Sequence, residues 1–322
     1  MTVSDNNIQE LQIAPHLPVL LTEVLEYLVL QDGKKYLDCT FGAGGYTKAM
    51  LNTANCSVVA LDQDPTVSMY ADEAKQEFGQ RFEFIQTNFA DAKSRLGNKK
   101  FDGIVLDLGV SSMQIDSAER GFSFMKDGPL DMRMGNADLT AAEFIASVAE
   151  EELANIIYKY GEEVQSRQIA KKIVEARQLQ PITTTLQLAE IIREAMHFRK
   201  AKIDPATKTF QAIRIYINKE LESLEKLLNE MEELLEPGGR ILVVSFHSLE
   251  DSIVKYFFKE HSPKKVARSK YAKELEVFNK EEWLQMITKK PVTPSKEEVQ
   301  SNPRARSSRL RVAAKIGGSN VA

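Results

Sequence analysis

A glycine-rich turn between two apolar segments constrains the fold of this chain more than any other feature. The segment Tyr36–Phe41 leads into the turn Gly42–Gly45, after which a helix can begin. A second apolar run, Ser57–Leu61, ends in Asp62. Doubly wound α/β domains build nucleotide sites in this way, because glycines let the backbone approach a ligand and an acid after the second strand accepts hydrogen bonds from ribose hydroxyls. The pattern predicts such a domain, with a dinucleotide or S-adenosylmethionine as its ligand.

The spacing of the glycines favours S-adenosylmethionine. A dinucleotide fingerprint is G-x-G-x-x-G, but here the position three after Gly44 is Thr47. A pyrophosphate also needs an open helix N-terminus, whereas a sulfonium cofactor depends more on nearby acids. Asp38, just before the turn, is placed to face the positively charged end of such a cofactor. An ordinary structural turn is the alternative, and the acids at both strand ends weigh against it.

Composition is that of a globular enzyme of one large domain with an insertion, or of two domains. The chain has 322 residues, of which 43% are hydrophobic and 27% charged. No apolar run reaches the roughly 18 residues of a membrane span, and Met1–Glu10 lacks the layout of a signal peptide. Cys39 and Cys56 read as buried thiols of a reducing compartment, and the four histidines have no metal-ligand spacing. We therefore expect a cytoplasmic protein with no membrane contact, no metal and no structural zinc.

The charges are unevenly distributed along the chain. Residues 261–322 contain 14 basic and 6 acidic residues, whereas the rest contains 28 basic and 40 acidic residues. A basic tail on an acidic body indicates contact with a polyanion. A solvated charged tail is the alternative that composition alone leaves open.

Helix and strand signals alternate over most of the chain and predict its domain organisation. Strands are predicted at 35–41, 56–62, 81–87, 101–108 and 240–246, with an edge strand near 309–314. Residues 119–201 show only helical periodicity, at 139–147, 150–160, 165–177 and 186–196. We therefore predict an α/β domain formed by residues 1–118 and 202–322, and an inserted helical domain at 119–201 that recognises the substrate.

Two polar clusters follow predicted strands at the edge where ligands of α/β sheets bind. Asp107, Ser111, Ser112 and Gln114 come directly after the fourth strand. Polar groups this dense after a buried strand are costly unless they are paired, so a site explains them better than a structural turn.

The second cluster follows the fifth strand. Ser248 and Asp251 are predicted to form a capping box for the next helix, which leaves Phe246 and His247 free to face the site. A histidine can transfer protons near neutral pH, although at a helix start it is often only an orienting donor.

Several long motifs together resemble one family. They are His16–Glu23, Asp38–Gly45, Leu106–Gln114, Arg120–Phe124, Asp127–Met134, Tyr160–Glu163, Thr209–Ile215, Ser245–Asp251 and Asn302–Arg311. In this order, and over nearly the whole chain, they resemble the MraW family of bacterial methyltransferases. The resemblance implies a class I S-adenosylmethionine-dependent methyltransferase fold, a Rossmann-like doubly wound sheet with a helical insertion. It also implies methylation of N4 of one cytidine in 16S rRNA of the small ribosomal subunit, near the decoding centre.

The resemblance also implies cofactor contacts at Gly44, Gly45, Tyr46, Asp62, Phe89, Asp107 and Gln114. The chemistry of the residues themselves makes Asp107, Ser111 and His247 the candidate catalytic residues. On the same grounds, the candidate substrate-binding residues are Phe122, Phe124, Phe246, Arg304, Arg306 and Arg309. Tyr46 stands where the family usually has histidine, Asp204 replaces a histidine, and Ser252 replaces an arginine. For Phe122 and Phe124, ordinary core packing is an equal alternative.

Two other functions remain open from the residues alone. A dehydrogenase would use the same fold with a nicotinamide cofactor, and a non-catalytic RNA-binding or ribosome-assembly factor would use the basic tail without a cofactor. The chain also lacks the Asn/Asp-Pro-Pro-Tyr motif of amino-methylating DNA enzymes after its fourth strand. Any acceptor for the target amine must therefore come from other residues.

Overall fold

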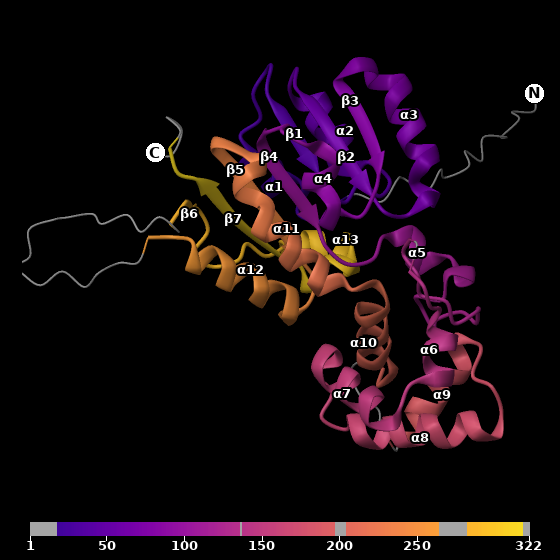
Figure 1. Ribbon diagram of the computed structural model, residues 1–322. Coiled ribbons are helices and arrows are strands. Elements are labelled where there is room, and N and C mark those ends of the chain that lie inside the picture. The colour runs from indigo at the N-terminus through magenta and orange to yellow at the C-terminus, as the bar shows by residue number, and fades with distance from the viewer. Residues whose placement is uncertain (1–17, 136, 197–203, 264–281, 318–322) are drawn as a thin grey trace, which may run out of the picture.

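The molecule has two parts, a sheet layered between helices and a smaller all-helical unit. The computed structural model describes residues 18–135, 137–196, 204–263 and 282–317. Figure 1 shows the helical unit at one end of the sheet domain, with α5 (Ser112–Asp116) near their junction and α10 (Ala206–Asn218) at the end of the helical unit that faces the sheet. The predicted combination of an α/β domain with a helical insertion is confirmed.

Seven strands form one sheet in the order β3-β2-β1-β4-β5-β7-β6. Their bounds are β1 Lys35–Asp38, β2 Ser57–Asp62, β3 Phe82–Gln86, β4 Phe101–Asp107, β5 Leu235–Ser245, β6 Leu284–Met286 and β7 Arg309–Lys315. The first five strands pair in parallel, and β7 runs antiparallel to β5 and β6. The expectation of an edge strand near 309–314 is wrong in one respect, because β6 covers the outer side of β7.

Both faces of the sheet are buried. Neighbouring residues of one strand belong to different apolar clusters, as Tyr36 and Leu37 do on β1 and Ile104 and Val105 do on β4. Burial on both faces explains why the central strands read as continuous apolar runs. One face is covered by α1 (Leu21–Leu28), α2 (Gly45–Thr53) and α3 (Ser68–Phe78), and the other by α4 (Ala92–Leu96), α11 (Glu220–Leu234) and α12 (Ser248–Glu260). The short α13 (Lys296–Ser301) lies near the N-terminal end, where Glu298 accepts a hydrogen bond from the Leu20 amide.

The helical unit has an apolar core of its own. It contains α6 (Ala141–Ser147), α7 (Glu150–Gly161), α8 (Ser166–Leu179) and α9 (Thr185–Ala195). The same core includes Phe210, Ile213 and Ile215 of α10, although α10 lies beyond the predicted domain boundary at residue 201. The helical unit therefore continues through α10 among the described residues. Within the described ranges, no helix is both long and apolar enough to cross a membrane.

The parallel strands place four loops at one edge of the sheet. In the register of the sheet, Asp38 at the end of β1 lies beside Ala60 of β2 and Val105 of β4, and Asp107 lies beside Val244 of β5. The loops that follow β1, β2, β4 and β5 therefore begin close together, as sites of this fold class require.

Candidate functional site

A cavity of about 490 Å³ opens at this edge of the sheet, which is a usual size for a small-molecule site. Loops after β1 to β5 form its wall together with residues of α10 and α11. Ten residues of the predicted site lie on the wall: Gly45, Tyr46, Asp62, Phe89, Asp107, Ser111, Gln114, Phe246, His247 and Arg304. Five others lie off it, namely Gly44, Phe122, Phe124, Arg306 and Arg309.

The glycine turn has a backbone that glycine adopts without strain. Gly42 has a φ of 54° and Gly44 a φ of 80°. Gly45 needs glycine for a different reason, because a Cβ there would lie 2.3 Å from Cγ of Pro18. Gly44 therefore serves the shape of the turn, while Gly42 and Gly45 lie on the cavity wall.

Tyr46 anchors the segment before α1. Its side chain is buried, and its hydroxyl donates a hydrogen bond to the Val19 carbonyl. Burial raises the pKa of the Tyr46 hydroxyl well above its ordinary value, so this group remains a neutral donor.

Asp204 is the second residue that departs from the family pattern. Its carboxylate accepts two hydrogen bonds from the Arg193 guanidinium, at 3.0 and 2.8 Å. It also accepts a hydrogen bond from the amide of Ala206, the first residue of α10, at 2.9 Å.

Two buried carboxyl groups flank the glycine turn. Asp38 accepts hydrogen bonds from the Thr47 hydroxyl at 2.7 Å and the Thr40 amide at 3.1 Å. Asp62 accepts them from the backbone amides of Gly42 at 2.8 Å and Asp64 at 2.9 Å. Burial raises the pKa of both groups to about 6, although these hydrogen bonds oppose the rise.

Asp107, at the end of β4, is the least compensated acid in the cavity. Its backbone amide donates to the Thr40 hydroxyl at 2.7 Å, but its buried Oδ1 has no hydrogen-bond partner. Burial, together with repulsion from Asp38 and Glu250, raises the pKa of Asp107 well above its ordinary value. A buried acceptor without a donor is costly, so this atom indicates a ligand that supplies a donor or a positive charge.

The surroundings of these acids suit a cation better than an anion. Burial is the largest cause of the raised pKa at Asp38, Asp62 and Asp107, and the neighbouring charges that add to the rise are those of other acids. A pyrophosphate would add negative charge to three uncompensated acids. S-adenosylmethionine instead brings a sulfonium, an ammonium and ribose hydroxyl donors. The turn Gly42–Gly45 with Asp62 and Asp107 therefore fits this cofactor.

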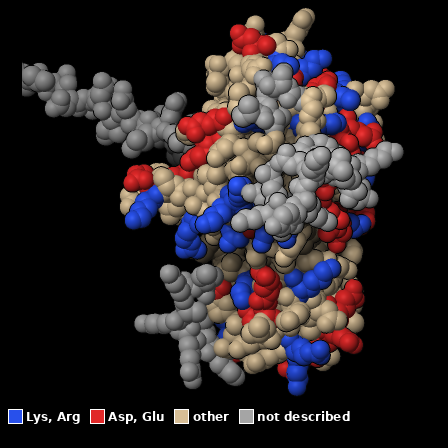
Figure 2. All heavy atoms as spheres, turned by 90° about the vertical axis from the view of Figure 1, so that its left-hand side faces the viewer, with Lys and Arg blue, Asp and Glu red and all other residues tan. Residues whose placement is uncertain are grey.

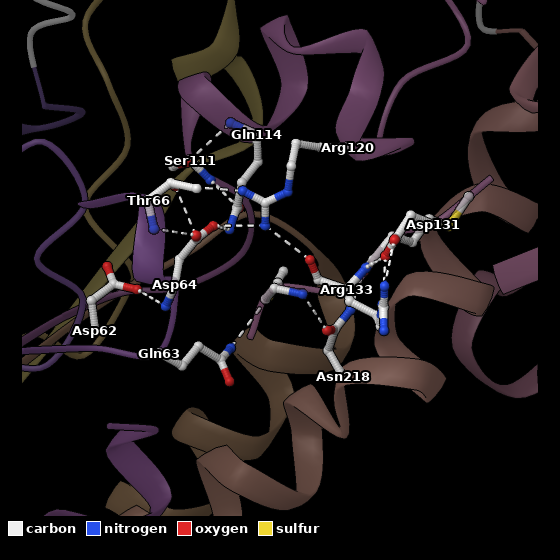
Figure 3. A network of polar contacts seen from close by, with 12 residues as sticks. Asp62, Gln63, Asp64, Thr66, Ser111, Gln114, Arg120, Asp131, Arg133 and Asn218 are labelled. Carbon is white, nitrogen blue, oxygen red and sulfur yellow. Dashed lines mark hydrogen bonds and ion pairs between the residues drawn. The ribbon is translucent and has the colours of Figure 1, made fainter. Parts of the chain in front are cut away.

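Asp64, two residues after Asp62, has the opposite surroundings. Its Oδ2 accepts a hydrogen bond from Gln114 at 2.7 Å and pairs with Arg120 at 2.8 Å, and its Oδ1 binds Thr66 (Figure 3). Burial raises the pKa of Asp64, but the hydrogen bonds from Arg120, Gln114 and Thr66 outweigh it and hold the pKa below its ordinary value. Asp64 is thus neutralised by the protein itself.

The network around Asp64 joins the cavity to the helical unit (Figure 3). Gln114 also forms a capping box with Ser111 at the start of α5, which fixes both predicted site residues. Arg120 donates to the Arg133 carbonyl at 2.9 Å. Asn218 of α10 then accepts a hydrogen bond from the Met134 amide at 2.8 Å.

His247 is the N-cap of α12. Its Nδ1 accepts a hydrogen bond from the Glu250 amide at 3.4 Å, and Glu250 accepts one from the Phe246 amide at 2.9 Å. The Nε2 atom of His247 lies 3.2 Å from Glu250 Oε1, but it is not aligned for a hydrogen bond and is otherwise unpaired. Its proposed role as a base therefore stays a prediction.

The predicted capping box of Ser248 and Asp251 is wrong. Asp251 instead forms ion pairs with Arg311, at 2.6 Å, and with Arg309, at 3.0 Å. Ser248 donates to Glu162 of the helical unit. The partners of both residues lie on distant segments, so the local spacing misled the prediction.

The predicted substrate-binding aromatics divide into two groups. Phe122 and Phe124 pack on the core of the helical unit, where the Phe124 ring meets Phe210 edge-on at 4.8 Å. They have the core-packing environment that the sequence left as the alternative. Phe246 lies on the cavity wall, and its ring is so near Gly109 that a Cβ added there would lie 3.6 Å from it. It is therefore the predicted aromatic residue that a ligand in the cavity can reach.

Sequence reasoning missed a charged cluster in the same cavity. Arg214 of α10 binds both carboxylate oxygens of Glu220 at 2.8 and 2.9 Å. Glu220, His247 and Glu250 offer ligand atoms within 4.8 Å of one another, which histidine spacing did not reveal. Because Arg214 already occupies Glu220, we describe the group as an ion-pair cluster. Its one sequence signal was an arginine inside the otherwise apolar stretch Ala212–Ile217.

Comparison with known proteins gives consistent matches. The model of the MraW methylase family matches residues 13–316. Ribosomal RNA small subunit methyltransferase H of Rickettsia canadensis (strain McKiel) is 60% identical over 94% of this chain and 98% of that protein. The protein of the same name from Rickettsia bellii (strain RML369-C) is 58% identical over 94% of this chain and 99% of that protein. A putative methyltransferase from Streptococcus mutans, solved in complex with SAH, matches with 10% identity over 94% of this chain and 100% of that one, at a TM-score of 0.44. The family and sequence matches extend over the sheet and the helical unit alike.

Proposed function

This chain belongs to the MraW methylase family, and on that premise we propose that it methylates ribosomal RNA. The proposed substrate is the exocyclic N4 of one cytidine in 16S rRNA of the small subunit, near the decoding centre. S-adenosylmethionine supplies an electrophilic methyl group. The observation that carries the proposal is the buried Oδ1 of Asp107, which has no hydrogen-bond partner and lies in a cavity suited to the sulfonium of this cofactor.

Asp107 has the properties that methylation of an aromatic amine requires. The lone pair of the cytosine amine is delocalised into the ring, so the amine is a poor nucleophile until an acceptor orients one of its N–H bonds. When bound, S-adenosylmethionine would supply the methyl group through the break of its bond from sulfur to the methyl carbon, as the bond from carbon to N4 forms. The amine would then carry a positive charge and release a proton, and we assign Asp107 Oδ1 as the acceptor of that proton. A raised pKa makes this carboxylate a stronger base.

The other residues on the wall position the reactants. A base in RNA must leave its stack to enter a cavity, and Phe246 offers an aromatic surface there. Ser111 forms a capping box with Gln114, so its side chain is held in place and stabilises the loop after β4. Holding the two reactants in line is expected to provide much of the acceleration.

Basic side chains on the cavity wall and elsewhere on the surface offer contacts to the phosphate backbone. Figure 2 shows lysine and arginine side chains gathered about halfway down one face, at the level where the sheet domain meets the helical unit. Arg304 lies on the cavity wall beside Asp116, and Arg306 is exposed. Arg309 keeps an exposed side chain although it pairs with Asp251. These three arginines support the proposed contact with RNA.

The direct test is methyl transfer to small ribosomal subunits that lack this modification. Labelled S-adenosylmethionine is supplied, and the nucleosides of the product are analysed. N4-methylated cytidine is the expected product. A different methylated nucleoside would overturn the proposed target, and cofactor binding without any transfer to the subunit would overturn the proposed substrate.

Replacing Asp62 by Ala separates an enzyme from a simple RNA-binding protein. The enzyme should lose about 10- to 100-fold in affinity for S-adenosylmethionine, the value of a hydrogen bond to a charged acceptor. Asp91→Ala is the matched control, since Asp91 pairs with Lys226 on the surface. Unchanged cofactor affinity in Asp62→Ala would contradict the assigned site.

A further inference from the structure

One part of the cavity wall lies outside the set of residues assigned to the cofactor. It is formed where α10 passes into α11 and where β5 passes into α12. Its polar residues are Gln211, Arg214, Asn218, Glu220, His247 and Glu250. Glu250 is close enough to Asp107 to raise the pKa of that acid. This polar wall therefore adjoins the residue proposed to hold the target amine.

Arg214 is held rigidly at the centre of the polar wall. Its Nε and Nη2 atoms bind the two oxygens of Glu220, and only 14% of its side chain is exposed. The Asn218 side chain donates to the Arg214 carbonyl at 2.9 Å, which ties this turn of α10 to the network of Figure 3. The Nη1 atom makes no hydrogen bond to another described residue. A fixed arginine with free donors is a binding group, because its fork geometry is set before any ligand arrives.

The polar wall also contains the imidazole of His247. Its side chain is 9% exposed, and its Nε2 lies 3.2 Å from Glu250 Oε1 in a contact that does not have hydrogen-bond geometry. The buried Oδ1 of Asp107, on the wall of the same cavity, has no partner. Natural proteins leave few buried polar atoms without a partner, so this oxygen indicates a polar ligand.

We infer that Arg214 recognises the target base, donating from Nη1 to the ring nitrogen or carbonyl beside the amine that Asp107 holds. The inference rests on the proposed function and deepens it. Cytosine presents an amine donor, a ring acceptor and a carbonyl acceptor in one row. An acceptor at Asp107 and a donor at Arg214 match that row. Uracil presents a carbonyl and a ring N–H at the first two positions, so it would oppose both groups.

Glu220 and Glu250 have supporting roles in this arrangement. Glu220 fixes the guanidinium, and its own side chain is 10% exposed. Glu250 is buried, and burial raises its pKa, but His247, the Phe246 amide and Arg214 together lower the pKa below its ordinary value. Glu250 therefore stays ionised and keeps a negative charge near the amine that becomes positive during transfer.

The test combines enzyme variants with altered substrates. Small subunits are reconstituted with rRNA that carries cytidine, 3-deazacytidine or 2-thiocytidine at the target position. 3-Deazacytidine lacks the ring acceptor, and 2-thiocytidine has a weaker carbonyl acceptor. The rate of methyl transfer is measured at limiting substrate for the wild type, Arg214→Met and Arg214→Lys.

The wild type should lose about 10- to 100-fold in kcat/KM on one of the two analogues, the value of a hydrogen bond from a charged donor. On cytidine, Arg214→Met should have a kcat/KM lower than that of the wild type by a similar factor. Its kcat/KM on that analogue should be little lower than its own value on cytidine. Arg214→Lys, which keeps the charge without the fork, should fall between them. Affinity for S-adenosylmethionine should stay within about twofold, because that ligand is held by other residues.

Two results would overturn the inference. One is full additivity, in which Arg214→Met loses the same factor on the analogue as the wild type does. The other is normal transfer to cytidine by Arg214→Met. Lys172→Met is the matched control, because Lys172 pairs with Glu194 on the surface of the helical unit and its loss should leave discrimination between the analogues intact. Wild-type enzyme that makes no N4-methylcytidine at all would instead refute the proposed function, so the two failures are distinguishable.

Discussion

The acids of this protein fall into two regions with opposite electrostatics. Around the glycine turn, Asp38, Asp62 and Asp107 have raised pKa values, and burial is the largest cause of each rise. Around α5 and α12, Asp64 and Asp251 bind arginines and have lowered pKa values. Where the protein neutralises an acid itself, the acid holds structure together. Where it leaves the acid uncompensated, a ligand is required to complete the site.

The largest expected effect follows from removing the charge of Asp107. Asp107→Asn keeps the shape of the side chain but cannot accept a proton. We expect methyl transfer to fall by about 10²- to 10⁴-fold, the usual value of a general base, which is a larger loss than that of cofactor affinity. Single-turnover transfer measures this effect. Asp102→Asn on the same strand is the control, because Asp102 pairs with Lys34 near the surface and should change transfer little. Near-normal turnover in Asp107→Asn would remove Asp107 from the essential residues.

The next largest effect is expected when a buried acid loses the arginine that neutralises it. Arg120→Met removes the cation from Asp64, whose side chain is only 3% exposed. The free energy of unfolding should fall by about 2–3 kcal/mol, because a buried carboxylate loses its partner. Lys99→Met breaks an exposed pair with Glu83 and should cost less than about 0.5 kcal/mol. Equal losses in the two variants, measured by urea denaturation, would contradict the structural role assigned to the buried pair of Asp64 and Arg120.

The uncompensated region could be predicted from sequence because its signals are local. The glycines, Asp38 and Asp62 lie within one strand-turn-helix-strand unit, and the alternation of apolar segments places them at one edge. Asp107 could also be assigned to this region from sequence, because it ends a continuous apolar run that predicts a buried parallel strand. The parallel register of the sheet then brings all three acids together.

The compensated region could not be predicted in this way, because its partners are distant in sequence. Asp64 meets Arg120 across 56 positions of the chain, and Asp251 meets Arg311 across 60 positions. No periodicity encodes such pairs, and for Asp251 the local spacing suggested a capping box that does not form. Arg214 was missed for the same reason, since its role depends on a cavity whose wall is built by several segments that are distant in sequence.

The pH dependence of cofactor binding should reveal the uncompensated acids directly. Asp38 and Asp62 have pKa values of about 6, so below that pH each carries a proton that a cationic ligand must displace. Affinity for S-adenosylmethionine should therefore rise with pH through about 6 and level off above about 7. Each proton released corresponds to at most about tenfold per pH unit. Calorimetry in buffers of different ionisation enthalpy measures the protons released. The neutral thioether S-adenosylhomocysteine should show a weaker dependence, and equal dependence for both ligands would contradict a role for the sulfonium charge.

The smallest expected effect is a gain in stability from a substitution of the buried Asp38, whereas most substitutions of buried residues destabilise a protein. Asp38 is completely buried, and its pKa is about 6 in the folded protein against about 3.9 in an unfolded chain. Between these values the folded state holds a proton that the unfolded state has lost. The contribution of Asp38 to stability is therefore complete below about pH 4 and is lost as the pH rises through 6.

Asp38→Asn should therefore stabilise the protein without ligand. The asparagine oxygen can accept the hydrogen bond from the Thr40 amide, and its NH₂ can donate to the Thr47 hydroxyl, so both contacts of Asp38 survive. We expect the free energy of unfolding at pH 8 to rise by about 1–2 kcal/mol, with little gain at pH 4. Asp64→Asn is the control of opposite sign, because the lowered pKa of Asp64 contributes stability at neutral pH that is lost in acid. Asp38→Asn should also bind S-adenosylmethionine more weakly. A variant that gains stability and keeps full affinity would show that the ligand does not use the charge of Asp38.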